Sequence, residues 1–244
     1  MRGVTKVGSL VIVLCGFGTS ARSQNIALSD NADPRFSWFD QRIGIANLPL
    51  LNGPEYYIPF KGFSSHPFYG ESAPAAGWVE YDGDLYAGVQ LLYDIFSDEL
   101  VLKYLRQDGL ISMIQLDKAR VSAFEVRGHH FEHRNVTNAS ARLSPGFYDI
   151  LFKGDRFEFA VKRVKETKLE SVDVVNFDQA DRFYLVQNDQ WSPISGLGSF
   201  NRLLVSKERQ QKLKSFVRSN HIKLRKKNDE DLRKIGSYCQ TLIQ

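Results

Sequence analysis

Short runs of alternating apolar and polar residues, separated by turn signals, fill the chain between Gly77 and Val186. A period of two is typical of β-strands that bury one face, because successive side chains point to opposite sides of the strand. Asp82-Gly83 lies between two such runs, and this dipeptide favours a two-residue hairpin turn in which both residues have positive φ. The runs recur about ten times, at a spacing of roughly 8–12 residues, which predicts an antiparallel β meander.

The run that follows Asp82-Gly83 shows the alternation most clearly. Its alternate apolar residues are predicted to share one buried face of a strand: Leu85, Ala87, Val89, Leu91, Tyr93 and Ile95. A meander of this kind forms a curled sheet, an open barrel or a sandwich, and the sequence leaves these alternatives open.

The period of two ends near Leu203, and the apolar spacing becomes the three to four residues of a helix. Ser206 is predicted to cap a helix over residues 207–219, and Asn228 or Asp229 to cap a second one. The predicted fold class is therefore mainly β, with a β domain over residues 77–205 and two α-helices in a basic segment over residues 206–244.

Residues 24–76 contain six of the eight prolines and many aromatic residues. So many rings are unusual in a disordered linker. We expect an ordered N-terminal wrap that buries its rings against the β domain, with short strands over residues 56–60 and 77–81.

The N-terminal residues 1–23 have the three-part layout of a secretory signal peptide. A basic start is followed by an apolar run over residues 7–17, too short to span a bilayer, and then by small and polar residues. Cleavage is expected before Gln24, with cleavage before Arg22 as an alternative. The layout predicts export to the periplasm or beyond. Lipid anchoring through Cys15 is disfavoured, because Leu14 stands where a small residue is needed.

Charge is segregated along the chain. Residues 24–205 hold 18 Lys and Arg against 24 Asp and Glu, net −6, whereas residues 206–244 hold 11 against 4, net +7. A basic segment of this kind attracts anionic lipid, nucleic acid or polyanionic glycan, or docks on the acidic body of its own chain. Export disfavours nucleic acid. The candidate anionic-surface residues are Lys223, Arg225, Lys226 and Lys227.

No motif predicts catalysis, a cofactor or a metal. G-x-S-x-G, H-E-x-x-H and a Gly-rich loop before a helix are absent. His129 and His133 flank the densest group of metal-type ligands, but on a strand they would lie about 13 Å apart, too far for one ion. Cys239 is the one cysteine beyond residue 23, so no internal disulfide is expected, and its place in an apolar helical pattern predicts a buried thiol.

Aromatic residues are the remaining candidates for binding. Four of them are candidate ligand-stacking groups, with core packing as the competing interpretation: Trp78, Tyr86, Tyr93 and Trp191.

Two segments, Leu51-Asn-Gly-Pro-Glu-Tyr56 and Ser65-His-Pro-Phe-Tyr69, together with the hairpin around Asp82-Gly83 and the basic two-helix ending, resemble a group of uncharacterised secreted proteins of Bacteroidota-type bacteria. The resemblance covers most of the chain beyond residue 23. It implies the same compartment and layout, and it transfers no site residue, because these proteins have no assigned activity.

Three functions remain open. The first is a non-enzymatic envelope protein that binds a small ligand, a glycan or another envelope protein. The second is a hydrolase whose carboxylate pair comes from distant strands. The third is a peripheral binder of anionic surfaces through the C-terminal helices.

Overall fold

A computed structural model describes residues 27–28, 49–106, 108–138, 141–224 and 228–243. The predicted signal peptide, residues 1–23, and most of the first half of the predicted wrap lie outside these residues. The prediction of a mainly β fold with two C-terminal helices is confirmed.

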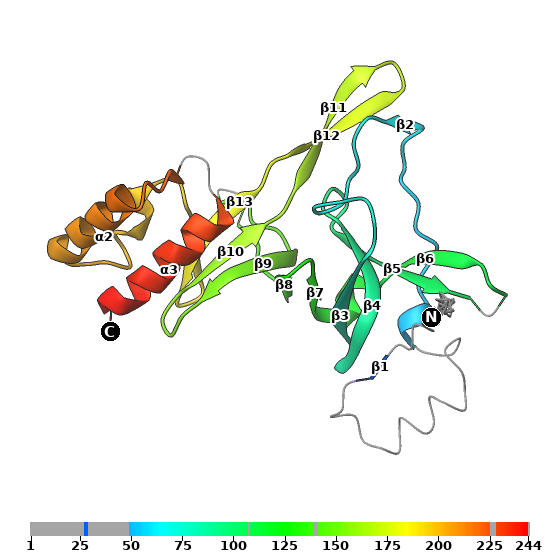
Figure 1. The fold of residues 1–244 in the computed structure, drawn as a ribbon, viewed down its shortest axis with the longest axis horizontal. Coiled ribbons are helices and arrows are strands. Elements are labelled where there is room, and N and C mark those ends of the chain that lie inside the picture. Colours follow the sequence, from blue (N-terminus) through cyan, green and yellow to red (C-terminus); the bar gives the residue numbers. More distant parts are fainter. Residues whose placement is uncertain (1–26, 29–48, 107, 139–140, 225–227, 244) are drawn as a thin grey trace, which may run out of the picture.

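Within the described residues, the largest element is an eleven-stranded antiparallel sheet in the order β14-β13-β10-β9-β8-β7-β3-β4-β5-β6, with β1 paired to β4 (Figure 1). Neighbours in the sheet are mostly neighbours in sequence, as a meander requires. The sheet is open, with β14 at one edge and β6 at the other. Its strands are β1 (Ala27–Leu28), β3 (Ala75–Tyr81), β4 (Asp84–Asp94), β5 (Glu99–Leu105), β6 (Ile111–Gln115), β7 (Val121–Val126), β8 (His129–Arg134), β9 (Gly146–Lys153), β10 (Glu158–Lys162), β13 (Arg182–Gln187) and β14 (Gln190–Pro193).

Tight turns set the register of the hairpins. Asp82 and Gly83, between β3 and β4, have φ of 55° and 86°, as the Asp-Gly signal predicts. Arg127 and Gly128, between β7 and β8, have φ of 55° and 73°. These two-residue turns match the right-handed twist of the strands that they join, so each hairpin forms locally.

A β-bulge in β4 makes the predicted buried face of that strand wrong for the residues that precede the bulge. Gly77 pairs with Val89 and Trp78 with Ala87, so Gly88, with φ 71°, is an extra residue in β4. The bulge exchanges the two faces of the strand. Val89 and the alternate residues after it are buried as predicted, but before the bulge Tyr86 is buried and Leu85 is 39% exposed.

A second, three-stranded sheet was not predicted. It has the order β11-β12-β2 and consists of β11 (Lys165–Ser171), β12 (Val174–Gln179) and β2 (Gly62–Phe63), with β12 and β2 parallel. The β11–β12 hairpin stands out from the main sheet (Figure 1). All of β11 after Lys165 is exposed, so this strand has no buried face to impose an alternating pattern.

Helices α2 (Lys207–Ser219) and α3 (Asp229–Ile243) begin and end close to where the sequence predicts. α3 packs on β9 and β10, and Gly236 allows the close approach, because a Cβ atom there would lie 2.5 Å from the Phe152 ring. Asn228 caps α3, since its Oδ1 accepts bonds from the amides of Glu230 and Asp231. Ser206 occupies the N-cap position of α2 without a side-chain capping bond.

The described part of the N-terminal wrap is ordered and only partly buried. Leu50, Leu51 and Phe68 enter the core, whereas Tyr57 is 76% exposed. The strand predicted over residues 56–60 is wrong, because the contact with β6 is an isolated bridge at Glu55 and two backbone hydrogen bonds, at Pro54 and Tyr56. Two prolines in this region, at positions 54 and 59, lack the amide that a longer ladder needs.

Two large apolar cores lie in the two halves of the main sheet. One lies within the β3–β8 half and is rich in stacked and edge-on aromatic rings, such as Phe124 and Phe131 at 4.7 Å. The other lies between β9, β10 and β13 and the two helices, around Phe159, Leu185 and Cys239.

Short 3₁₀ turns complete the fold: η2 (Pro49–Leu51), η3 (Lys118–Arg120) and η4 (Leu197–Phe200). No helix among the described residues is long and apolar enough to cross a lipid bilayer.

Candidate ligand-binding cleft

An open cleft of about 730 Å³ lies where the β11–β12 hairpin leaves the main sheet. Its walls come from the loop at Ala141 and Arg142, the base of the hairpin, β13 and the residues that follow β14. This volume lies within the range of small-molecule sites, and the lining combines aromatic and aliphatic side chains with arginines and carboxylates.

The loop at Arg142 is held in place by a buried tyrosine. Tyr184, on β13, is 1% exposed, and its hydroxyl donates to the carbonyls of Ala141 at 2.9 Å and Arg142 at 3.2 Å. Arg142 has φ of 54°, a conformation that an arginine adopts only at an energetic cost, and the tyrosine bonds stabilise it. The Arg142 side chain is exposed at the cleft and forms no ion pair with the described residues.

The two carboxylates of the cleft are both held by arginines. Glu166, on β11, lies 3.2 Å from Arg182 on β13. Asp181 accepts bonds from Arg163 at 2.7 Å, from the amide of Val164 and from the amide group of Gln179. Every partner of Asp181 is a donor, so its carboxyl oxygens are held in place by Arg163, the backbone and Gln179.

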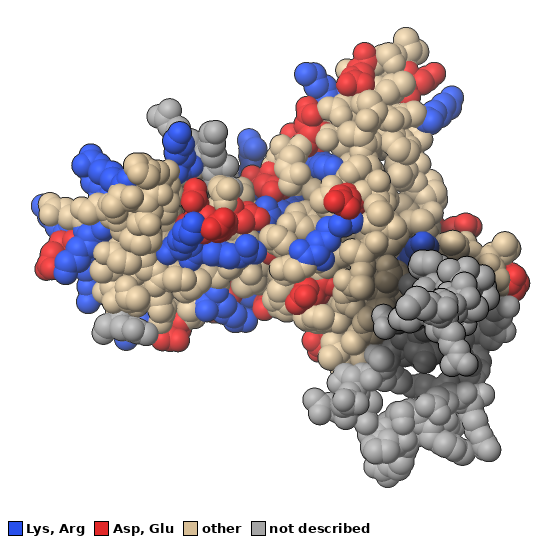
Figure 2. All heavy atoms as spheres, in the orientation of Figure 1, with Lys and Arg blue, Asp and Glu red and all other residues tan. Residues whose placement is uncertain are grey.

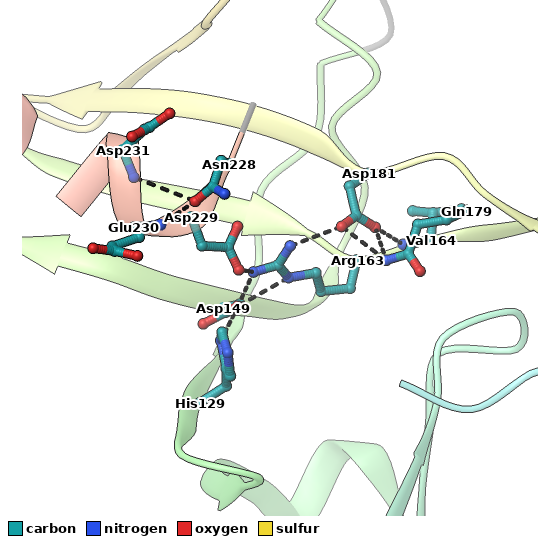
Figure 3. A network of polar contacts seen from close by, with 10 residues as sticks. All are labelled: His129, Asp149, Arg163, Val164, Gln179, Asp181, Asn228, Asp229, Glu230 and Asp231. Atoms are coloured by element: carbon teal, nitrogen blue, oxygen red, sulfur yellow. Dashed lines mark hydrogen bonds and ion pairs between the residues drawn. The ribbon is translucent and has the colours of Figure 1, made fainter. Parts of the chain in front are cut away.

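Arg163 lies at the centre of a buried polar network behind the cleft (Figure 3). Its guanidinium binds Asp149 of β9 at 2.5 and 2.9 Å and Asp229 of α3 at 2.5 Å, besides Asp181. His129 of β8 contacts the same Asp149 oxygen through Nδ1 at 2.7 Å. The network therefore joins the sheet, the base of the hairpin and the start of α3.

Burial and ion pairing act in opposite directions on Arg163. Burial lowers the pKa of its guanidinium, but the charge of Asp149 and the hydrogen bond that the guanidinium donates to Asp229 outweigh burial and raise the pKa above its ordinary value. The ring of Tyr69, centred 5.4 Å away, covers the guanidinium, and its own pKa is raised by burial. Arg163 is therefore a fixed positive charge in the rear wall of the cleft.

The same network contains a group of metal-type ligands. Ligand atoms of His129, Asp149 and Asp229 lie within 4.8 Å of one another. However, the Arg163 guanidinium already bonds both carboxylates, so a metal ion would have to displace it. The arrangement supports an arginine-bridged joint between α3 and the sheet rather than a cation site. His130 and His133 lie apart from it, beside Glu132 and Phe147 respectively.

Two of the four predicted stacking residues belong to the core. Tyr86 and Tyr93 are 3% and 1% exposed, so neither ring is open to a ligand, and the stacking prediction for them is wrong. Tyr93 instead packs edge-on against three phenylalanine rings and donates to Asp98 at 2.6 Å. Its position on the buried face of β4 favours core packing over ligand binding.

The two tryptophans are half-buried and lie far apart in the sheet order, on β3 and β14. Trp78 donates to Glu125 at 3.3 Å and lies against His130. Trp191 packs on Tyr148 and on Tyr184, so it supports the cleft from behind without lining it.

Among the described basic residues of the C-terminal segment, none forms an ion pair with the acidic body. Lys212 and Lys234 pair with glutamates of their own helices, and among the described residues the ion pair that joins the segment to the body is Arg163–Asp229, which has the opposite polarity. Lys223 is exposed, whereas Arg225, Lys226 and Lys227 lie outside the described residues. Cys239 is buried as predicted, and burial raises the pKa of its thiol to about 12.

The residues of the cleft were missed by the sequence analysis, although one signal was present. Asp149 and Arg163 are charged residues in or next to otherwise apolar strands, and a buried charge requires a partner. Comparison with protein-family models, curated proteins and solved structures finds no match to this chain. The resemblance to secreted proteins of Bacteroidota-type bacteria therefore stays a prediction, and the functional argument rests on the geometry of the cleft.

Proposed function

We propose that the protein is an exported bacterial envelope protein that binds, without chemical conversion, a small ligand with an apolar body and a negatively charged group. Export rests on the layout of residues 1–23 and on the resemblance stated above. Ligand binding rests on one observation: the exposed Arg142 forms no ion pair with a described residue, and it shares the lining of the cleft with Ala141, Ala180 and Pro193, apolar residues that are at least partly exposed.

The fixed walls of the cleft favour ligand binding over hydrolysis. Tyr184 fixes the loop that carries Arg142, and the Arg163 network fixes the rear wall, so little ordering is needed when a ligand enters. Hydrolysis by a carboxylate pair has less support. Glu166 and Asp181 both bind arginines, whereas that mechanism needs two carboxyl groups that face the substrate.

Three probes of equal length and different charge test the proposal by isothermal titration or by NMR shifts: hexanoate, hexanol and hexylammonium. Hexanoate should bind with a Kd on the order of millimolar, as expected for so small a ligand, and the other two more weakly. The Arg142→Ala variant should lose the preference for hexanoate. Arg156→Ala is the matched control, because Arg156 is also exposed but lies outside the cleft.

Two results would contradict the proposal. One is hexanol binding as tightly as hexanoate to the unaltered protein. The other is turnover of an ester or glycoside substrate that disappears in the Asp181→Asn variant, which would favour the hydrolase instead.

A further inference from the structure

Helix α2 carries a line of cations that the cleft does not use. Lys207, Lys214 and Arg218 are exposed and lie at spacings of seven and four residues, which places them on one face of the helix. None of the three forms an ion pair with a described residue. Lysine and arginine side chains gather over the two C-terminal helices in Figure 2, at the left of the view.

A groove with an apolar floor runs beside this line. It has a volume of about 380 Å³ and lies between α2 and the η4 turn. The half-buried Leu197 provides apolar surface in its lining, with Phe200, Leu204 and Leu213 buried beneath, and the two cations Lys207 and Lys214 lie at its side. Next to the start of the helix, Val205 is 84% exposed. Apolar surface and unpaired positive charge therefore meet at one place.

We propose that this face of α2 docks on an anionic phospholipid bilayer, with the phosphate of one lipid between Lys207 and Lys214 and its glycerol region against the apolar floor of the groove. The proposal does not depend on ligand binding in the cleft. Amphipathic surfaces with lysines beside apolar side chains bind at the boundary between head groups and acyl chains.

Charge complementarity identifies the occupant. α2 carries five Lys and Arg against one glutamate, whereas residues 24–205 carry net −6. An anionic surface attracts the helix and repels the body, so it orients the molecule with α2 toward the membrane. Nucleic acid would satisfy the cations as well, but its phosphate backbone offers nothing to Val205 or to the apolar floor.

The test is co-sedimentation of the full chain with vesicles of equimolar phosphatidylglycerol and phosphatidylcholine, and with vesicles of phosphatidylcholine alone. The first should be bound at least about tenfold more tightly, since each basic residue near the surface contributes to binding. Raising the salt from about 0.05 M to about 0.5 M should release the protein, because the screening length becomes shorter than the range of the attraction.

Two pairs of charge reversals distinguish binding through the α2 face from attraction by the net charge of the molecule. Lys207→Glu with Lys214→Glu should weaken binding to the anionic vesicles at least about tenfold. Lys61→Glu with Lys168→Glu changes the net charge equally at exposed positions outside the C-terminal helices, and it should have little effect. Lys207→Gln with Lys214→Gln, which introduces no acid, should give an intermediate loss, and circular dichroism of each variant checks folding.

Three outcomes would overturn the proposal. The two reversals could weaken binding equally, which would make net charge responsible rather than the α2 face. Both kinds of vesicle could be bound equally, which would assign binding to apolar contact alone. A short DNA duplex could bind more tightly than the anionic vesicles at equal salt, which would identify nucleic acid as the occupant.

Discussion

The Arg163 side chain is 4% exposed and binds aspartates from three separate segments, so its removal tests how the network contributes to stability. We expect Arg163→Gln to lower the free energy of unfolding by about 3–5 kcal/mol, because Asp149 would remain buried without its cation. Urea denaturation measures the change. Arg182→Gln is the matched control: its partner Glu166 is 61% exposed, and the loss should stay below about 1 kcal/mol. Equal losses would show that Arg163 acts as a surface ion pair.

The network also shows that the sequence alone does not identify the partners of a buried charged residue. A charged residue in an apolar strand, such as Asp149, signals a buried partner. The partners of Arg163 lie 14, 18 and 66 residues away along the chain, so only the folded topology identifies them. For the same reason the tyrosine that fixes Arg142 was not recognised, since Tyr184 lies more than 40 residues from the loop it binds.

Among the strands, β4 depends on the backbone conformation of one glycine. Gly88 has φ of 71° and open space around it, so Gly88→Ala should cost about 1–2 kcal/mol of unfolding free energy through backbone strain alone. Gly198→Ala is the matched control, because Gly198 has similar space and no positive φ, and it should change stability by less than about 0.5 kcal/mol. If both variants unfold alike in urea, the bulge is not under conformational constraint.

Elements with one buried face were the ones that the sequence predicted. β7 lies within the predicted meander between Gly77 and Val186, and α2 covers the predicted range, because each buries one side more than the other. The Gly88 bulge was missed because a single extra residue changes the alternation without ending it. β11 was missed because its side chains are exposed on both faces, so its pairing with β12 leaves no periodic signal.

For the molecule as a whole, the position of Cys239 tests whether the helices and the sheet unfold together. The thiol lies in a core formed by both helices and by β-strand residues such as Phe159 and Leu185. The main sheet then continues without a break from β13 to β6. Exposing the thiol therefore requires the helices to separate from the sheet, and its raised pKa keeps it unreactive until then.

In a Cys15→Ser background, we expect alkylation of Cys239 to begin only in the urea range where tryptophan fluorescence reports global unfolding, because one continuous sheet couples the two cores. A cysteine placed two residues away on the exposed side of α3, by Ser237→Cys with Cys239→Ser, is the control and should react without urea. Alkylation of Cys239 well below the fluorescence transition would contradict the prediction. That result would mean that the C-terminal helices open as a separate unit while the sheet stays folded.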